Sequence, residues 1–317
     1  MAEIGKDMAK AKALLEQGKL VAIPTETVYG LAGNALRADA VTGIFAAKNR
    51  PFFDPLIVHV PEIEMARRYV REIPPIALVL MKAFWPGPLT VLLDRREIIP
   101  DLVTAGLDRV GIRCPNHPLT HTLLQSLSFP LAAPSANPFG YVSPTTPAHV
   151  EEQLGDKIDY ILDGGECKVG IESTIVGFEN EVPVIYRTGG LSMEKIEMVI
   201  GTVEVRTQSV SNPQAPGQLQ SHYAPRKRVF VGDIEKLIQE HDRVGILSFQ
   251  KKFSSHKIEH QLILSPSGDV NEAAQKLFSA LRELDKSNAD VILTEEVPNE
   301  GLGRAINDRL KRAATNS

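Results

Sequence analysis

Pairs of polar side chains stand at the ends of apolar runs in this sequence, at spacings that suit ligand binding. In "IPTETVYGL", Thr25 and Thr27 flank a glutamate directly after an apolar run. Side chains two residues apart in extended chain point to the same side, so the two hydroxyls are predicted to lie together. They either cap a turn locally or form the floor of a pocket for a small polar ligand.

A second group is cationic and lies in "AAKNRPFFDPLIVHV". Lys48 and Arg50 follow a predicted helix, which Pro51 ends. Cations are favoured at a helix C-terminus, but a lysine point charge beside an arginine fork also suits a triphosphate. His59 lies inside the apolar run, either as a core histidine or as a ligand contact.

Hydroxyl and amide side chains recur in later loops. In "AAPSANPFGYVSPTTP", Ser135, Asn137 and Ser143 stand on a proline-rich frame, and are either ordinary loop residues or donors to phosphate oxygens. Ser173 enters a predicted strand in "ESTIV", and Arg187 leaves one in "VIYRTGG". The sequence contains no Walker loop, no G-x-S-x-G elbow and no kinase motif set. This pattern favours binding and orienting anionic substrates, with no catalytic nucleophile from the protein.

His117 and His121 have the i, i+4 spacing of zinc histidines. No H-E-x-x-H pattern surrounds them and no third ligand is evident, so a metal site is not predicted there.

The bulk composition bounds the class of protein. The chain has 317 residues, of which 43% are hydrophobic and 23% charged, which is typical of one large globular domain or two. A net charge of −4 argues against a general nucleic-acid coat protein but leaves room for a local basic cleft. No apolar run is long enough to predict a membrane span. The two cysteines lack metal-ligand spacing, and a reducing cytoplasm is expected.

Predicted helices and strands interleave along the whole chain, which indicates an α/β or mixed α+β fold. Helices are predicted near 6–17, 62–71, 75–84, 146–154, 269–285 and 302–314, and Asn116 is a plausible N-cap of a further helix. Residues 206–228 are polar and proline-rich and are predicted to form a linker. The chain is therefore predicted to consist of a large N-terminal domain (1–205), the linker (206–228) and a small Rossmann-like parallel α/β domain (229–317).

Taken together, these stretches resemble the threonylcarbamoyl-AMP synthase family in its long form, a YrdC-like domain followed by a C-terminal extension. The resemblance covers about residues 10–226. It is carried, in the family's order, by "PTETVYGL", "KNRPFFDPLIVHV", "WPGPLT", "GIRCP", "APSAN", "ESTIV", "YRTG" and "PGQLQSHYAP". It implies a YrdC-like domain built on a twisted mixed sheet.

The resemblance also implies a reaction, in which L-threonine, bicarbonate and ATP give threonylcarbamoyl-AMP and pyrophosphate. Partner transferase proteins then use this intermediate to modify an adenosine of tRNA. Mg²⁺ is expected with ATP, because charge builds on the leaving pyrophosphate. Whether the chain contacts tRNA directly is left open.

The match assigns residues to two ends of a pocket. On the threonine side it places Thr25, Thr27, His59, Arg113, Ser173 and the backbone of Ala133. On the ATP side it places Lys48, Arg50, Asp54, Arg109, Ser135, Asn137, Ser143, Arg187, His222 and Tyr223, the last two in a linker that folds over the site. Asp54 stands where asparagine is common in relatives, and Arg109 where threonine is common.

Two other classes of function remain as alternatives. One is a module that binds double-stranded RNA or tRNA on a basic concave surface, whose affinity would fall steeply with salt. The other is a carbamoyl transferase acting on a different acceptor, as in hydrogenase-maturation relatives.

Overall fold

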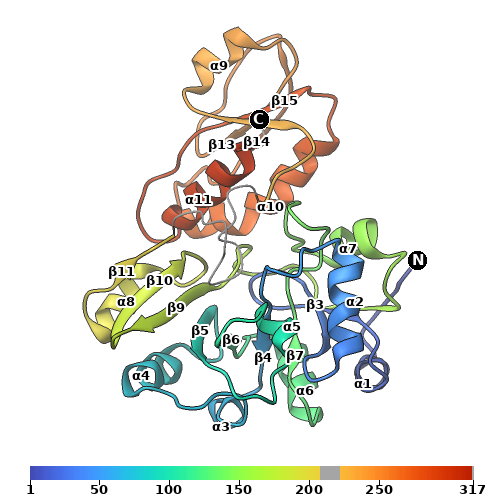
Figure 1. Cartoon of the computed structure of the whole chain (residues 1–317). Coiled ribbons are helices and arrows are strands. Elements are labelled where there is room, and N and C mark those ends of the chain that lie inside the picture. Colours follow the sequence, from blue (N-terminus) through green and yellow to red (C-terminus); the bar gives the residue numbers. More distant parts are fainter. Residues whose placement is uncertain (208–221, 316–317) are drawn as a thin grey trace. The chain divides into compact units, whose positions relative to one another are not determined.

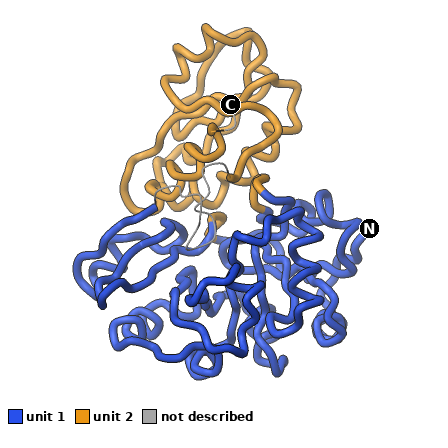
Figure 2. Tube along the Cα trace, in the orientation of Figure 1, with its two compact units in different colours: residues 1–139, 144–168, 172–219 blue, residues 140–143, 169–171, 220–317 orange. Residues whose placement is uncertain are grey.

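The computed structural model describes residues 1–207 and 222–315. These residues form two compact units (Figure 2): the first contains residues 1–139, 144–168 and 172–219, and the second contains 140–143, 169–171 and 220–317. Two short segments that precede residue 172 therefore group with the C-terminal part of the chain. The predicted boundaries at 205 and 228 remain a prediction, since residues 208–221 of the predicted linker lie outside the described residues.

The first unit is built on one large mixed sheet with helices packed around it (Figure 1). Its strands are β1 (Glu3–Gly5), β2 (Val21–Ile23), β3 (Gly30–Asn34), β4 (Ile57–His59), β5 (Leu89–Asp94), β6 (Arg109–Arg113), β7 (Leu131–Ala132), β8 (Tyr160–Leu162), β9 (Thr174–Glu179), β10 (Val182–Arg187) and β11 (Glu204–Val205). Its helices are α1 (Met8–Glu16), α2 (Ala38–Lys48), α3 (Ile63–Ala66), α4 (Pro75–Phe84), α5 (Asp101–Thr104), α6 (Pro118–Ser126), α7 (Pro147–Leu154) and α8 (Met193–Ile200).

The strand order of this sheet is β1-β8-β2-β3-β7-β4-β6-β5-β9-β10-β11. Parallel and antiparallel pairs both occur along it, and strands that are not consecutive in the sequence become neighbours, such as β4 and β6. The central strands are apolar and buried, and together with α2 and α4 they enclose the main hydrophobic core. The mixed sheet and its helices confirm the predicted fold class.

Local capping explains where several helices begin. Ser192 accepts a hydrogen bond from the Lys195 N–H and caps α8, as the serine before "MEKIEMVI" suggests. The prediction of Asn116 as the N-cap of α6 is wrong. His117 occupies that position, because Pro118 fixes the first helical residue one place later. The backbone N–H of Asn116 instead donates to Glu26.

The second unit contains a four-stranded sheet in the order β12-β15-β13-β14, with every pair parallel. This confirms the predicted parallel α/β arrangement after the linker. Its elements are β12 (Arg228–Val231), α9 (Ile234–Glu240), β13 (Val244–Ser248), β14 (Ile258–Ile263), α10 (Val270–Lys286), β15 (Val291–Thr294) and α11 (Gly303–Ala314). Helix α9 was not predicted from the sequence. Within the described ranges, no helix has the length and apolarity needed to cross a membrane.

Candidate active site

Polar side chains gather at one edge of the large sheet, where several strands end or begin. The parallel strands β4 and β6 end at His59 and Arg113, and the register places these two residues opposite each other. Arg113 is also paired with Thr90 at the start of the antiparallel strand β5. Ser173 directly precedes β9, which is parallel to β5. Because paired residues lie about 5 Å apart on one face, the sheet itself brings His59, Arg113 and Thr90 together.

The two threonines of "PTETVYGL" lie side by side, as predicted. Their hydroxyl oxygens are 2.8 Å apart, and both side chains are buried. The Thr25 hydroxyl is also bonded within the turn: it donates to the Val28 carbonyl and accepts from the N–H groups of Thr27 and Val28. Thr25 therefore builds the turn, and the turn aims the Thr27 hydroxyl.

Arg113 connects this turn to the edge of the sheet. Its Nη2 donates to the Thr27 hydroxyl over 2.9 Å and lies 2.8 Å from the Glu26 carboxylate. The same carboxylate oxygen of Glu26 accepts from the Asn116 N–H at 3.1 Å. Glu26 thus orients Arg113, a role that the sequence reasoning missed. The signal was present, since Glu26 lies between the two threonines.

Two buried polar atoms of this group are available for further hydrogen bonds. Arg113 Nε and Glu26 Oε1 have no hydrogen-bond partner among the described residues. Buried polar atoms in native proteins are nearly always bonded, because an unsatisfied buried group costs about 1–3 kcal/mol. The pair is therefore suited to a small molecule that carries both an acceptor, such as a carboxylate, and a donor.

His59 stands beside Arg113 as a neutral imidazole. Burial, together with the positive charge of Arg113, lowers its pKa to about 3. Its Nδ1 lies 3.2 Å from the Ile57 carbonyl, which fixes the ring orientation. A neutral histidine at this place offers a hydrogen bond without adding a second cation.

Ser173 is held from two sides. Its hydroxyl lies 2.8 Å from the Thr90 hydroxyl. The Arg187 guanidinium donates to the Ser173 carbonyl through Nε and Nη2, at 3.1 and 3.0 Å, and from Nη2 to the Ser173 hydroxyl at 3.2 Å. Thr90 is a second residue that the sequence analysis missed, because "WPGPLT" supported the resemblance but no role was assigned to its threonine.

Lys48 uses its ammonium group to hold a loop. Its Nζ donates to the backbone carbonyls of Ser135 and Asn137, and the side chain is fully buried. Burial, and secondarily the charge of Arg50, lower the pKa of Lys48 well below its usual value. Lys48 therefore fixes the loop that carries the two predicted phosphate donors, and its own contact with a triphosphate remains a prediction.

Arg50 and Asp54 form a buried ion pair with 2.9 Å between Nη2 and Oδ2. Arg50 also donates to the backbone carbonyls of Asp54 and Pro55. Burial raises the pKa of Asp54, while the charges of Arg50, Lys48 and Arg187 oppose that rise. Three cations thus surround one carboxylate, and Arg187 links this cationic group to Ser173.

Arg109 lies at the opposite end of β6 from Arg113, roughly 13 Å away at the usual strand rise. Its Nη1 donates to the Tyr186 hydroxyl at 3.2 Å, and its guanidinium lies 5.2 Å from the centre of that ring. Arg109 and Arg113 occupy the same face, with Gly111 between them. The contact of Arg109 with ATP remains a prediction.

The remaining predicted residues divide between the units. In the first unit, Ala133 donates its N–H to the Ile57 carbonyl and packs beside Gly30. Ser143, His222 and Tyr223 belong to the second unit, where all three are buried. Their roles at a nucleotide therefore remain predictions.

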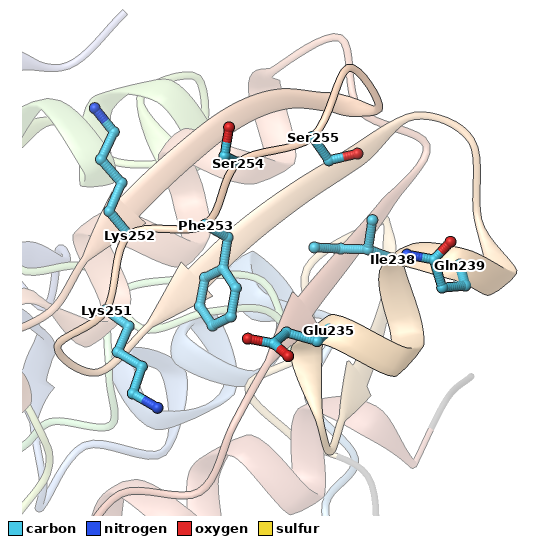
Figure 3. A pocket seen from close by; sticks show the side chains of 8 residues that line it. All are labelled: Glu235, Ile238, Gln239, Lys251, Lys252, Phe253, Ser254 and Ser255. Atoms are coloured by element: carbon cyan, nitrogen blue, oxygen red, sulfur yellow. The ribbon is translucent and has the colours of Figure 1, made fainter.

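A surface cavity of about 380 Å³ in the second unit contains none of the predicted residues (Figure 3). It lies between α9 and residues 251–255, and the close-up shows Lys251 and Lys252 extending in opposite directions. The two lysine charges therefore do not converge on the cavity.

Two family comparisons match nearly the whole chain. Residues 13–189 match the sequence model described as "Telomere recombination", also designated Sua5_yciO_yrdC. Residues 191–315 match the model of the threonylcarbamoyl-AMP synthase C-terminal domain.

Individual relatives agree with these models. The chain is 42% identical to the threonylcarbamoyl-AMP synthase of Pyrococcus abyssi, over 96% of this chain and 93% of the relative. It is 39% identical to that of Bacillus subtilis, over 97% and 92%. The fold matches the crystal structure of P. abyssi Sua5 complexed with L-threonine, with a TM-score of 0.92, 39% identity and coverage of 99% and 97%. The chain therefore belongs to the threonylcarbamoyl-AMP synthase family, in the form that carries the C-terminal domain.

Proposed function

We propose that this chain condenses L-threonine, bicarbonate and ATP into threonylcarbamoyl-AMP and pyrophosphate. One observation carries the proposal. Hydrogen bonds and strand pairing connect the Thr27–Arg113 pair through Thr90 and Ser173 to Arg187, whose positive charge acts on Asp54 together with those of Arg50 and Lys48. The alcohols and Arg113 suit a small amino acid, and the cations suit a triphosphate.

The proposed position of the threonine substrate follows from the two buried atoms that lack a partner in the described part of the chain, Arg113 Nε and Glu26 Oε1. Arg113 Nε would donate to the substrate carboxylate, and the Thr27 hydroxyl would contact the amino acid beside it. Charge-assisted bonds from an arginine to a carboxylate are short and directional. Because the Glu26 carboxylate forms an ion pair with Arg113 Nη2, the guanidinium is held in place before the substrate binds.

The chemistry has two steps. The threonine amine forms a bond to the bicarbonate carbon, water leaves, and a carbamate results. A carbamate oxygen then attacks the α-phosphorus of ATP, and the bond to the β-phosphate oxygen breaks to release pyrophosphate. Carbamates decompose in water, so the buried positions of Thr27, His59 and Ser173 favour a site that excludes solvent. Orientation of the reactants supplies much of the acceleration.

The nucleotide end is cationic and supplies few metal ligands. Arg50 and Arg187 would stabilise charge on the polyphosphate, while Asp54 orients Arg50. Among the described residues, no cluster of three histidine, cysteine or acidic side chains could hold a metal ion. Mg²⁺ would therefore be held mainly by phosphate oxygens and water, which is the usual way it accompanies ATP, and would neutralise charge on the leaving pyrophosphate.

We also propose that the product is passed to transferase proteins that modify tRNA, in the cytoplasm. The support is chemical: a mixed carbamic–phosphoric anhydride is an activated acyl donor that needs an acceptor soon after release. The two free, buried cysteines are compatible with a reducing compartment.

The function is tested by incubating the full chain with ATP, Mg²⁺, bicarbonate and each amino acid in turn, and measuring pyrophosphate. We expect release that requires both threonine and bicarbonate, with serine as the informative close analogue. Release without an amino acid, or equal release with all of them, would refute the proposal.

A further inference from the structure

The second unit contains three short segments that include, or lie next to, residues predicted to bind the nucleotide. We call residues 140–143, 169–171 and 222–224 the docked segments. The first contains Ser143, the third contains His222 and Tyr223, and the second leads directly into Glu172 and Ser173. Each is fixed by side chains or backbone of α10 and α11.

Arg282 of α10 holds the first docked segment by its backbone. Its Nε donates to the Ser143 carbonyl at 3.3 Å, and its Nη2 donates to the Val142 carbonyl. The guanidinium also lies 5.1 Å from the centre of the Tyr141 ring. Arg282 is 2% exposed, and a charge so buried is tolerated only when it is closely paired with acceptors. The planar fork suits two successive carbonyls in a way that a lysine does not.

Asp285, one turn further along α10, ties the first segment to the chain just after the third. It accepts from the Tyr141 hydroxyl at 2.6 Å and from the Lys227 N–H at 2.9 Å. The Ala224 N–H donates directly to the Gly140 carbonyl at 2.9 Å. The segment carrying Ser143 and the segment carrying Tyr223 are therefore one connected structure.

Tyr223 is the anchor of the third segment. It has a φ of +64°, which is uncommon for a residue with a side chain and persists only where packing enforces it. Its ring stacks on Phe278 of α10 with centroids 5.7 Å apart, and the Arg309 guanidinium of α11 lies 4.9 Å from its centre. Tyr223 is 1% exposed, so its ring is packed inside the second unit.

The second docked segment approaches α10 so closely that only glycine fits. A Cβ on Gly170 would lie 2.4 Å from the Gln275 Cα and 2.5 Å from its carbonyl oxygen, and φ is +79°. Backbone meets backbone here, so no side-chain rearrangement could accommodate a methyl group.

We propose that the C-terminal unit positions the nucleotide-binding segments of the enzyme, with Arg282 as the principal positioning residue. The inference rests on the proposed function and on the prediction from the sequence that Ser143, His222 and Tyr223 belong to the ATP side of the site. Arg282 does not touch substrate in this role. It sets the backbone of residues 142–143, and the Asp285 and Tyr223 contacts fix the other docked segment relative to it.

The test compares Michaelis constants for the two substrates in the full chain. Arg282→Lys keeps the charge but loses the fork, and should raise the KM for ATP at least fivefold while the KM for threonine stays within twofold. Leu284→Ala is the matched control. It lies on the same helix, its side chain packs against Gly245 of β13, and it should destabilise the unit without changing either KM.

Two further variants keep the test decisive if Arg282→Lys does not fold. Tyr141→Phe removes the hydroxyl that donates to Asp285 and should raise the KM for ATP by a smaller factor than Arg282→Lys. Gly170→Ala should also raise the KM for ATP, because the added methyl group displaces the second docked segment. Unchanged constants in the folded variants, or equal increases for ATP and threonine, would overturn the inference.

A direct titration with ATP in the absence of threonine separates this inference from the proposed function. If the wild-type chain binds ATP but releases no pyrophosphate with threonine, the proposed function fails. The effect of Arg282→Lys on ATP affinity then still decides the positioning role.

Discussion

Arg113 and Thr27, 86 positions apart in the sequence, are joined by a hydrogen bond of 2.9 Å in the interior of the first unit. The bond places a charged donor against a short hydroxyl at the point where β6 ends. It also gives the threonines of "PTETVYGL" two roles, since Thr25 closes the turn and Thr27 is presented to the site.

Thr27→Val replaces the hydroxyl by a methyl group of similar volume and leaves a donor of Arg113 unsatisfied. A lost bond to a buried charged partner costs about 1–3 kcal/mol, so the KM for threonine should rise roughly five- to a hundredfold. The KM for ATP should change less than twofold. Thr27→Ser keeps the hydroxyl and serves as the control. Equal loss for both substrates would show that Thr27 acts on the fold and not on threonine.

Glu26→Gln tests the buried ion pair with Arg113, whose partners are 5% and 7% exposed. Removing one charge of such a pair leaves the other buried without compensation, at a typical cost of about 3–5 kcal/mol. We expect a large fall in the urea midpoint, followed by the fluorescence of Trp85, the single tryptophan, which lies in the first unit. Glu64→Gln, in an exposed pair with Arg67, should leave the midpoint nearly unchanged. Similar midpoints for the two variants would contradict the assignment.

Arg187→Lys tests whether a guanidinium group is needed where the threonine end of the proposed site meets the ATP end. Arg187 reaches both the carbonyl and the hydroxyl of Ser173, which a lysine ammonium cannot do in the same geometry. We expect kcat to fall at least tenfold, with threonine-dependent pyrophosphate release as the measurement. Lys195→Arg on α8 is a control for a basic exchange in the same unit. Wild-type kcat in Arg187→Lys would remove the residue from the proposed mechanism.

The sequence predicted that short hydroxyl side chains lie together, but it did not predict which side chains bond to them. The spacing i, i+2 predicted that Thr25 and Thr27 lie together. They do, but their hydroxyls meet in the turn that follows β2 and not in extended chain. Glu26 and Thr90 were missed because their partners, Arg113 and Ser173, become neighbours only through pairing of β4, β5, β6 and β9.

The contacts of Lys48 could not be predicted from the sequence either. Its place after a helix and before Pro51 suggested a cation presented to a triphosphate, but in the fold its ammonium is turned inward onto two backbone carbonyls. The docked segments could not be foreseen either. Nothing in the local pattern of residues 140–143 shows that they join a domain formed largely from residues after 220.

His59 predicts how stability depends on pH. Its pKa is about 3 in the folded chain against an ordinary 6.5, so between these values the unfolded chain binds more protons than the folded one. The contribution of His59 to the free energy of unfolding should therefore rise with pH from about 3 to 6.5, by about 1.4 kcal/mol per pH unit, and stay constant above that range. In His59→Gln this slope should become shallower by up to that amount. The measurement is the urea midpoint at pH 4.5, 5.5 and 7.5, read from Trp85 fluorescence. His256→Gln, at an exposed position, should keep the wild-type slope. If His59→Gln and the wild-type chain showed the same slope, His59 would not be the buried neutral imidazole described here.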